Sequence, residues 1–170
     1  FLLLTIALSV CMIFSIILIS AGAQEEFKNT QRSKAQIAIL GITDDQLSSL
    51  RQNKDVQWIG EYAAIGLFYS GNKTITVAYG SEDYFTHQEE MSLQGSVPQK
   101  ANEIMLPQNY IDFLGESYRP GDTITFDVTG TGDEAEYTLS GILNEDRKSE
   151  GYFVYLSKDL AMSLRDHLQV

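Results

Sequence analysis

The chain opens with a long apolar run that carries no charged side chain between Phe1 and Gln24. At about 1.5 Å of rise per helical residue, residues 1–23 span roughly 33 Å, enough for a ~30 Å hydrocarbon core. A helix that is apolar on every side would otherwise need a much larger protein around it. The pattern therefore predicts a transmembrane helix over residues 1–23, with residues 24–170 outside the cytoplasm.

A cleavable secretory signal peptide is the alternative interpretation of this run. Ala21, Gly22 and Ala23 resemble a cleavage site, but the run is longer than the roughly 7–15 apolar residues of a signal peptide. The chain begins with Phe and has no basic residue before the run, so we expect it to be a fragment of a longer polypeptide. Both interpretations place the remainder outside the cytoplasm.

Polar residues follow the apolar run, and short structured elements are predicted after them. Residues 24–34 contain neither Gly nor Pro, so we expect the membrane helix to continue as a helical stalk. Apolar residues on both faces predict a strand over residues 35–42. Thr43–Gln46 has the form of a capping box, which predicts a short helix with Leu47 and Leu50 facing inward.

Two apolar runs and a polar connection fill the middle of the chain. The runs Val56–Tyr69 and Thr74–Tyr79 are separated by turn residues, so they predict an antiparallel hairpin. Residues 81–100 are polar and predict a connection or a small helical excursion.

Strands and helices alternate in the remainder. Short apolar runs and alternating apolar positions predict four more strands, at residues 103–106, 123–129, 137–143 and 152–156. Pro107 suits the first turn of a helix that ends at Gly115, and Ser157 can cap a closing helix. Gly141 interrupts a strand, which indicates a β-bulge or a close backbone approach. Residues 35–170 are therefore predicted to form an α+β domain of mostly antiparallel strands with short helices.

Composition and charge exclude several classes of protein and of binding site. Hydrophobic residues make up 44% of the chain and aromatic residues 11%, which excludes a disordered protein. The 12 basic and 23 acidic residues give a net charge of -11, which argues against a nucleic-acid partner. That charge can attract a cationic peptide or cell-envelope protein. Cys11 is the only cysteine, so no disulfide and no cysteine-based zinc site can form within the chain.

Candidate chemistry is sparse. The sequence has no GxxxxGK[ST] phosphate-binding loop and no GxSxG nucleophile elbow. His87 and His167 have no second His or Cys at ligand spacing. Four acidic clusters do not match a calcium-binding loop: Asp44-Asp45, Glu89-Glu90, Asp133–Glu136 and Glu145-Asp146.

Two further features have structural interpretations as well as functional ones. Trp58 and the tyrosines could form a ligand platform, but aromatic residues at strand spacing more often belong to a core. Residues 72–74 form a glycosylation acceptor, yet they also have the composition of a tight turn. We therefore predict a non-enzymatic domain without catalytic, cofactor-binding or metal-binding residues.

A more specific pattern runs from residue 95 to residue 143. It comprises Gly95–Pro98, Asn102–Pro107, Tyr110, Phe113–Gly115, Pro120–Phe126 and Tyr137–Leu143. This pattern resembles the extracytoplasmic core domain of MacB/FtsX-like ABC transporter permeases, and residues 3–10 look like the start of such a permease's first membrane helix. The motifs are structural rather than catalytic.

The resemblance implies a MacB periplasmic-core-like fold in a bacterial cell membrane permease. It also implies three partners: a cytoplasmic ATP-binding-cassette ATPase on a separate subunit or domain, a second permease copy in a homodimer or heterodimer, and the lipid bilayer. The outer domain would couple ATP hydrolysis to extracytoplasmic movement or recognition of substrate. Family roles include transport of peptides, antibiotics and lipoproteins, and control of cell-wall enzymes.

Two other classes share this organisation. The sensor domain of a membrane-bound signalling receptor also has an N-terminal helix and an acidic α+β ectodomain. A surface adhesin is the third class. The number of membrane helices after Val170 would separate the three classes, since a permease needs three, a sensor needs one and an adhesin needs none.

Overall fold

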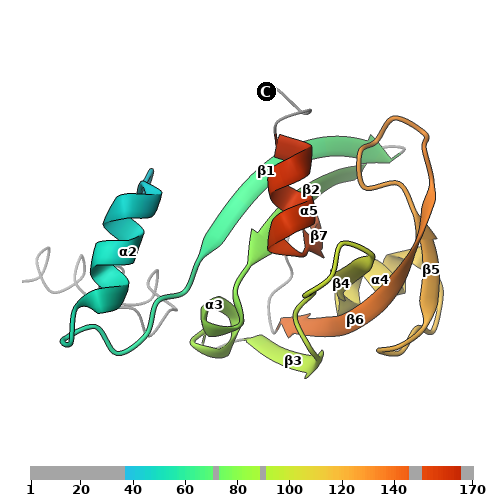
Figure 1. Cartoon of the computed structure of the whole chain (residues 1–170). Coiled ribbons are helices and arrows are strands. Elements are labelled where there is room, and N and C mark those ends of the chain that lie inside the picture. The colour runs from blue at the N-terminus through green and yellow to red at the C-terminus, as the bar shows by residue number, and fades with distance from the viewer. Residues whose placement is uncertain (1–36, 71–72, 89–90, 146–150, 166–170) are drawn as a thin grey trace, which may run out of the picture. The chain divides into compact units, whose positions relative to one another are not determined.

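The computed structural model describes residues 37–70, 73–88, 91–145 and 151–165 (Figure 1). The predicted transmembrane helix, residues 1–23, and the predicted stalk, residues 24–34, lie outside this part of the chain. Within the described ranges, no helix has the length and apolar character needed to cross a membrane.

Helices and strands alternate along the described chain, as expected for a mixed fold. In chain order they are α2 (Asp44–Gln52), β1 (Tyr62–Ser70), β2 (Lys73–Gly80), α3 (Glu82–Thr86), β3 (Met91–Gly95), β4 (Glu103–Pro107), α4 (Gln108–Leu114), β5 (Thr123–Phe126), β6 (Ala135–Glu145), β7 (Tyr152–Leu156) and α5 (Lys158–Arg165).

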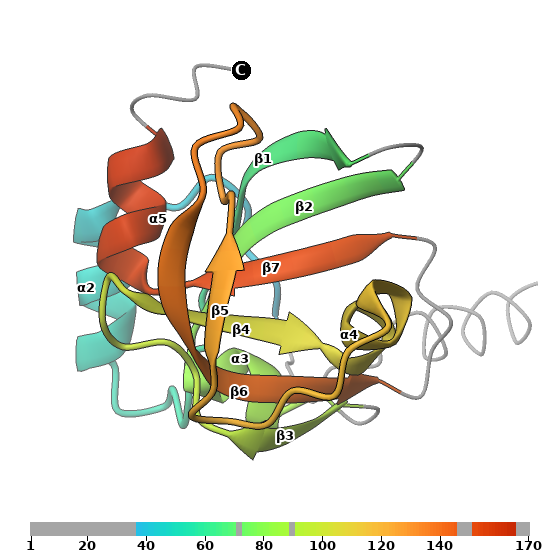
Figure 2. The same cartoon turned by 90° about the vertical axis from the view of Figure 1, so that its right-hand side faces the viewer.

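These strands form one mixed sheet in the order β1-β2-β7-β4-β6-β3, with β5 also paired to β6 (Figure 2). Four pairs are antiparallel: β1–β2, β4–β7, β3–β6 and β5–β6. Two pairs, β2–β7 and β4–β6, are parallel. The predicted α+β class with mostly antiparallel strands is therefore confirmed, and so is the β1–β2 hairpin.

The core lies on both faces of the sheet. On one face, strand residues such as Val154 and Leu156 pack with α4 and with Ala161 of α5. On the other face, Tyr155 and Met105 pack with Phe85 of α3. The central strands β4 and β7 are buried on both sides, which explains why their sequences are continuously apolar instead of alternating.

The predicted strand over residues 35–42 is wrong for the part described, because residues 37–42 belong to no strand. Ile37 and Leu40 have 78% and 95% of their surface exposed. The apolar pattern is typical of a strand, but these residues pair with no strand of the described sheet. Local preference alone does not make a strand, since a strand requires a partner.

Other element boundaries differ from the prediction for local reasons. The run that begins at Val56 becomes a strand only at Tyr62. The polar stretch 81–100 contains the predicted helical excursion as α3, and also β3, which the sequence did not reveal. β5 ends at Phe126 because the Asp127 carboxylate accepts hydrogen bonds from the backbone N–H groups of the next loop.

The predicted caps of α2 and α5 and the predicted end of α4 are confirmed, whereas Pro107 ends β4 and immediately precedes α4 instead of lying in its first turn. Thr43 and Gln46 form the reciprocal capping box of α2, although Leu47 and Leu50 are only half-buried. α4 ends at Gly115, whose φ of 73° is left-handed and therefore favours glycine. The hydroxyl of Ser157 accepts a hydrogen bond from the Leu160 N–H at the start of α5.

Gly141 fulfils both roles expected of a glycine inside a strand. Ile104 pairs with Leu139 and Met105 pairs with Gly141, so Ser140 is an extra residue in β6. A Cβ atom built on Gly141 would lie 2.5 Å from the carbonyl oxygen of Ser96. The bulge and the close approach of the 94–96 backbone therefore both depend on the missing side chain.

We predict that Gly141→Ala lowers the free energy of unfolding of fragment 35–170 by about 1–3 kcal/mol, because the methyl group must displace backbone. Urea unfolding followed by circular dichroism measures the change. Gly151→Ala is the matched control, since nothing lies within 4 Å of its Cβ position. Equal stability of the two variants would contradict this role for Gly141.

Candidate functional site

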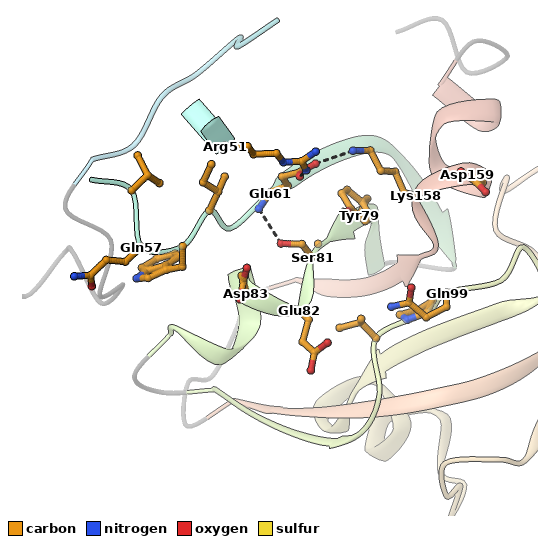
Figure 3. A pocket seen from close by; sticks show the side chains of 16 residues that line it. Arg51, Gln57, Glu61, Tyr79, Ser81, Glu82, Asp83, Gln99, Lys158 and Asp159 are labelled. Atoms are coloured by element: carbon orange, nitrogen blue, oxygen red, sulfur yellow. Dashed lines mark hydrogen bonds and ion pairs between the residues drawn. The ribbon is translucent and has the colours of Figure 1, made fainter. Parts of the chain in front are cut away.

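A cavity of about 680 Å³ lies where the N-terminal part of the described chain meets one end of the sheet (Figure 3). Its lining comes from the last turn of α2, residues 56–61, the end of β2, the start of α3, residues 97–99 and the first residues of α5. Residues 56–61 cross from α2 to β1, and we call them the strap. The lining is largely polar, with buried Val97 and Pro98 among it.

Glu61 is the centre of the charged groups in this cavity. One carboxylate oxygen, Oε1, forms an ion pair with the Arg51 guanidinium at the end of α2. The other, Oε2, lies 2.8 Å from the Lys158 Nζ at the start of α5. Lys158 also lies over the Tyr79 ring, with Nζ 5.7 Å from its centroid. One side chain thus connects the end of α2 to the start of α5, which are distant in sequence.

The pKa values follow from this arrangement. Partial burial raises the pKa of Glu61, but hydrogen bonding and charge from Lys158, and then from Arg51, outweigh it and lower the pKa below 4.5. The hydrogen bond to Glu61 raises the pKa of Lys158 above 10.5. Both groups are therefore charged at neutral pH, and the ion pair is complete.

Aromatic stacking fixes the strap to α3. Trp58 stacks on His87 with ring centroids 4.0 Å apart and an interplanar angle of 8°. Tyr62 stacks on Tyr84 at 5.0 Å. Gly60 lies so close to α3 that a Cβ atom would be 2.8 Å from the Tyr84 Cα. The strap is thus packed tightly over the helix, and the cavity lies beside it.

The residues considered above as candidate ligands form no metal site in the described part of the chain. Trp58 and His87 come together in the stack, while His167, Cys11 and Glu89-Glu90 lie outside the described residues. In the ranges that the structure describes, no group of three or more His, Cys, Asp or Glu side chains is arranged to hold a metal ion. Asp44-Asp45 occupies the first turn of α2, where acidic residues favour a helix N-terminus.

The aromatic residues considered as a ligand platform belong mainly to the core. Tyr110 and Tyr155 are each 3% exposed. Phe113 is 44% exposed and stacks on Tyr152, with centroids 4.8 Å apart and Lys73 nearby. The core interpretation therefore holds for the buried rings, whereas Tyr62 and Tyr69 are exposed, as Phe113 is.

Two motif residues between 95 and 143 form hydrogen bonds with the backbone of neighbouring segments. The Glu103 carboxylate accepts N–H groups from Gln99 at 2.8 Å and Lys100 at 3.2 Å. The N–H of Gly121 donates to the Leu139 carbonyl at 2.8 Å. Glu103 thus closes a turn and Gly121 joins a loop to β6, as expected of structural motifs.

Sequence reasoning missed the Arg51–Glu61–Lys158 triad. Glu61 is 10 residues from Arg51 and 97 from Lys158, so no short motif contains the three. One pattern could have indicated it, because Glu61 is the only charged residue between Val56 and Asn72. A lone charge in an apolar run needs a partner elsewhere in the fold.

Comparison with known proteins supplies the family. The family model described as "MacB-like periplasmic core domain" matches residues 1–169. The chain belongs to this family. The resemblance carried by residues 95–143 to the core domain of MacB-like permeases is therefore confirmed.

A curated relative agrees with this assignment. The chain is 28% identical over 128 residues to a protein of Staphylococcus haemolyticus (strain JCSC1435) named as a hemin transport system permease, HrtB. The alignment covers 72% of this chain and 33% of the relative. The MacB-like core thus spans about a third of the relative's length.

We predict that Glu61→Gln destabilises fragment 35–170 by about 1 kcal/mol near pH 7, since exposed ion pairs each contribute ~0.2–1 kcal/mol. The folded-state pKa of Glu61 is lowered, so its stabilisation is complete above the unfolded value of 4.5 and is lost as pH falls through the folded value. Urea unfolding at several pH values should show the two proteins converging in acid. A difference in stability that is constant from pH 7 to pH 3 would contradict the prediction.

The control is Glu82→Gln, which removes an exposed carboxylate from the same cavity. We expect it to change the free energy of unfolding by less than about 0.5 kcal/mol at each pH.

Proposed function

We propose that this domain is the outer part of a permease that couples cytoplasmic ATP hydrolysis to extracytoplasmic movement or recognition of substrate. The observation that supports it best is the Arg51–Glu61–Lys158 triad, which ties α2 near the start of the domain to α5 near its end. Transmission of movement requires such a connection between the segment that enters a domain and the segment that leaves it.

The two-sided core supports a mechanical role. A close-packed interior deforms little, so a displacement applied at one point moves the body as a unit. The described residues form a sheet packed on both faces, and they contain no group of three or more His, Cys, Asp or Glu side chains arranged to hold a metal ion. We propose a non-catalytic domain, with the ATPase on a separate subunit or domain.

The proposed setting follows from the family and the sequence. Residues 1–23 would cross the bacterial cell membrane, residues 24–34 would form the stalk, and residues 24–170 would be extracytoplasmic. A second permease copy, in a homodimer or heterodimer, would complete the transporter. The net charge of -11 suits a cationic peptide or cell-envelope protein as an outer partner.

The cargo classes proposed are peptides, antibiotics and lipoproteins, with control of cell-wall enzymes as a related role. Hemin is a further cargo to test, because the HrtB relative is named as a hemin transport system permease. Proteoliposomes that contain the full-length permease and its ATPase would report ATP-dependent movement of hemin or of a cationic peptide. An ATPase with an inactivated hydrolytic site provides the background.

The stalk gives the sharpest test of coupling. Replacing Thr30 and Gln31 with Pro and Gly should break the predicted helix, because Pro costs about 3 kcal/mol within a helix. We expect ATP hydrolysis to continue while transport falls at least tenfold. Replacing the same two residues with Ala-Ala, which preserves a helix, should leave transport intact. Unchanged transport in the Pro-Gly variant would refute mechanical coupling through the stalk.

A further inference from the structure

α2 is not held in place by the core. None of its nine residues is buried, and Ile37 and Leu40 before it are exposed. Figure 1 shows α2 beside the sheet and outside its layers. Because Leu47 and Leu50 are only half-buried, packing contributes little to holding α2, and polar contacts are needed to set its orientation.

Glu61, in contrast, projects from a fixed backbone. Its N–H donates to the Ser81 hydroxyl at 2.9 Å, and its carbonyl accepts the Ser81 N–H at 2.9 Å. The strap before it is stacked on α3 through Trp58. The carboxylate is therefore presented at a defined point beside the end of β2.

The two carboxylate oxygens are used by two different elements. Oε1 forms an ion pair with Arg51 of α2, and Oε2 forms an ion pair with Lys158 of α5 (Figure 3). α5 is itself anchored, because Ala161 is fully buried in the larger cluster. One side chain thus sets the position of a loosely held helix relative to an anchored one.

We propose that Glu61 is the positioning residue of a joint that holds α2 to α5, so that displacement of the chain before α2 carries the sheet with it. This inference rests on the proposed function and names the residue through which movement passes. The Arg51 and Lys158 side chains are 54% and 47% exposed, so water can replace either ion pair without disturbing the core. Loss of the joint therefore frees α2 and leaves the domain folded.

Spin labels on α2 and α5 test the joint directly. Ser48→Cys and Ser163→Cys place labels on exposed positions of the two helices, in full-length permease in which Cys11→Ser and the replacement of every other native cysteine leave these two as the only thiols. Pulsed electron paramagnetic resonance then gives the distribution of distances between them. We expect a narrow distribution that is the same at rest and after trapping with ATP and vanadate.

Glu61→Gln should at least double the width of this distribution and make its mean depend on ATP and vanadate, since α2 then moves without α5. Glu82→Gln removes the same charge from the cavity without touching an ion pair, so it should match the wild type. A Glu61→Gln distribution as narrow as that of Glu82→Gln would overturn the proposal, as would a broad wild-type distribution.

Charge inversion separates a positioning role from a merely structural one. The triple variant Arg51→Glu, Glu61→Arg, Lys158→Glu reverses every charge of the triad and should restore a narrow distribution. A distribution as broad as that of Glu61→Gln would overturn the electrostatic joint. The resting measurement needs neither cargo nor hydrolysis, so failure of ATP-dependent transport would reject the proposed function while the joint is still decided by these widths.

Discussion

The sheet depends on β6, because this one strand pairs with three others. Its first half bonds to β5, its second half to β3, and its opposite edge to β4. The change of partner occurs around Ser140, where the strand bulges and Gly141 admits the backbone of residues 94–96. Every motif between residues 95 and 143 contributes to this crossing, either as a strand of it or as the turn that leads there.

Local chemistry was the part of the fold that could be predicted from the sequence. Thr43 caps α2 and Gly115 ends α4, because those preferences act over a few residues. Pairing was harder to predict, since it depends on distant segments. β3 is short, with only Met91 and Leu93 apolar, and it pairs with β6. Residues 37–42 have a strand-like pattern and pair with no described strand.

The candidate site was less predictable than the fold, for the same reason. Glu61 is a single acidic residue in an apolar run, and its partners come from the end of α2 and the start of α5. Only the register that brings β2 beside β7 places Lys158 next to Tyr79 and Glu61. The position of the Arg51–Glu61–Lys158 triad therefore depends on the whole sheet. Motif residues such as Glu103, in contrast, form hydrogen bonds within their own turn.

The parallel pairing of β2 with β7 also has a consequence for biosynthesis. Val77 of β2 pairs with Val154 of β7. The edge of β2 that faces away from β1 therefore has no partner until β7, the last strand described, has been synthesised. The β1–β2 hairpin must wait until most of the domain has been synthesised before its second strand is paired on both edges. Closing so long a loop is entropically costly and slow, and an open apolar edge attracts other chains meanwhile. The order of strands therefore makes the period before β7 is complete, rather than the finished fold, the stage at which this domain is most exposed to misassembly.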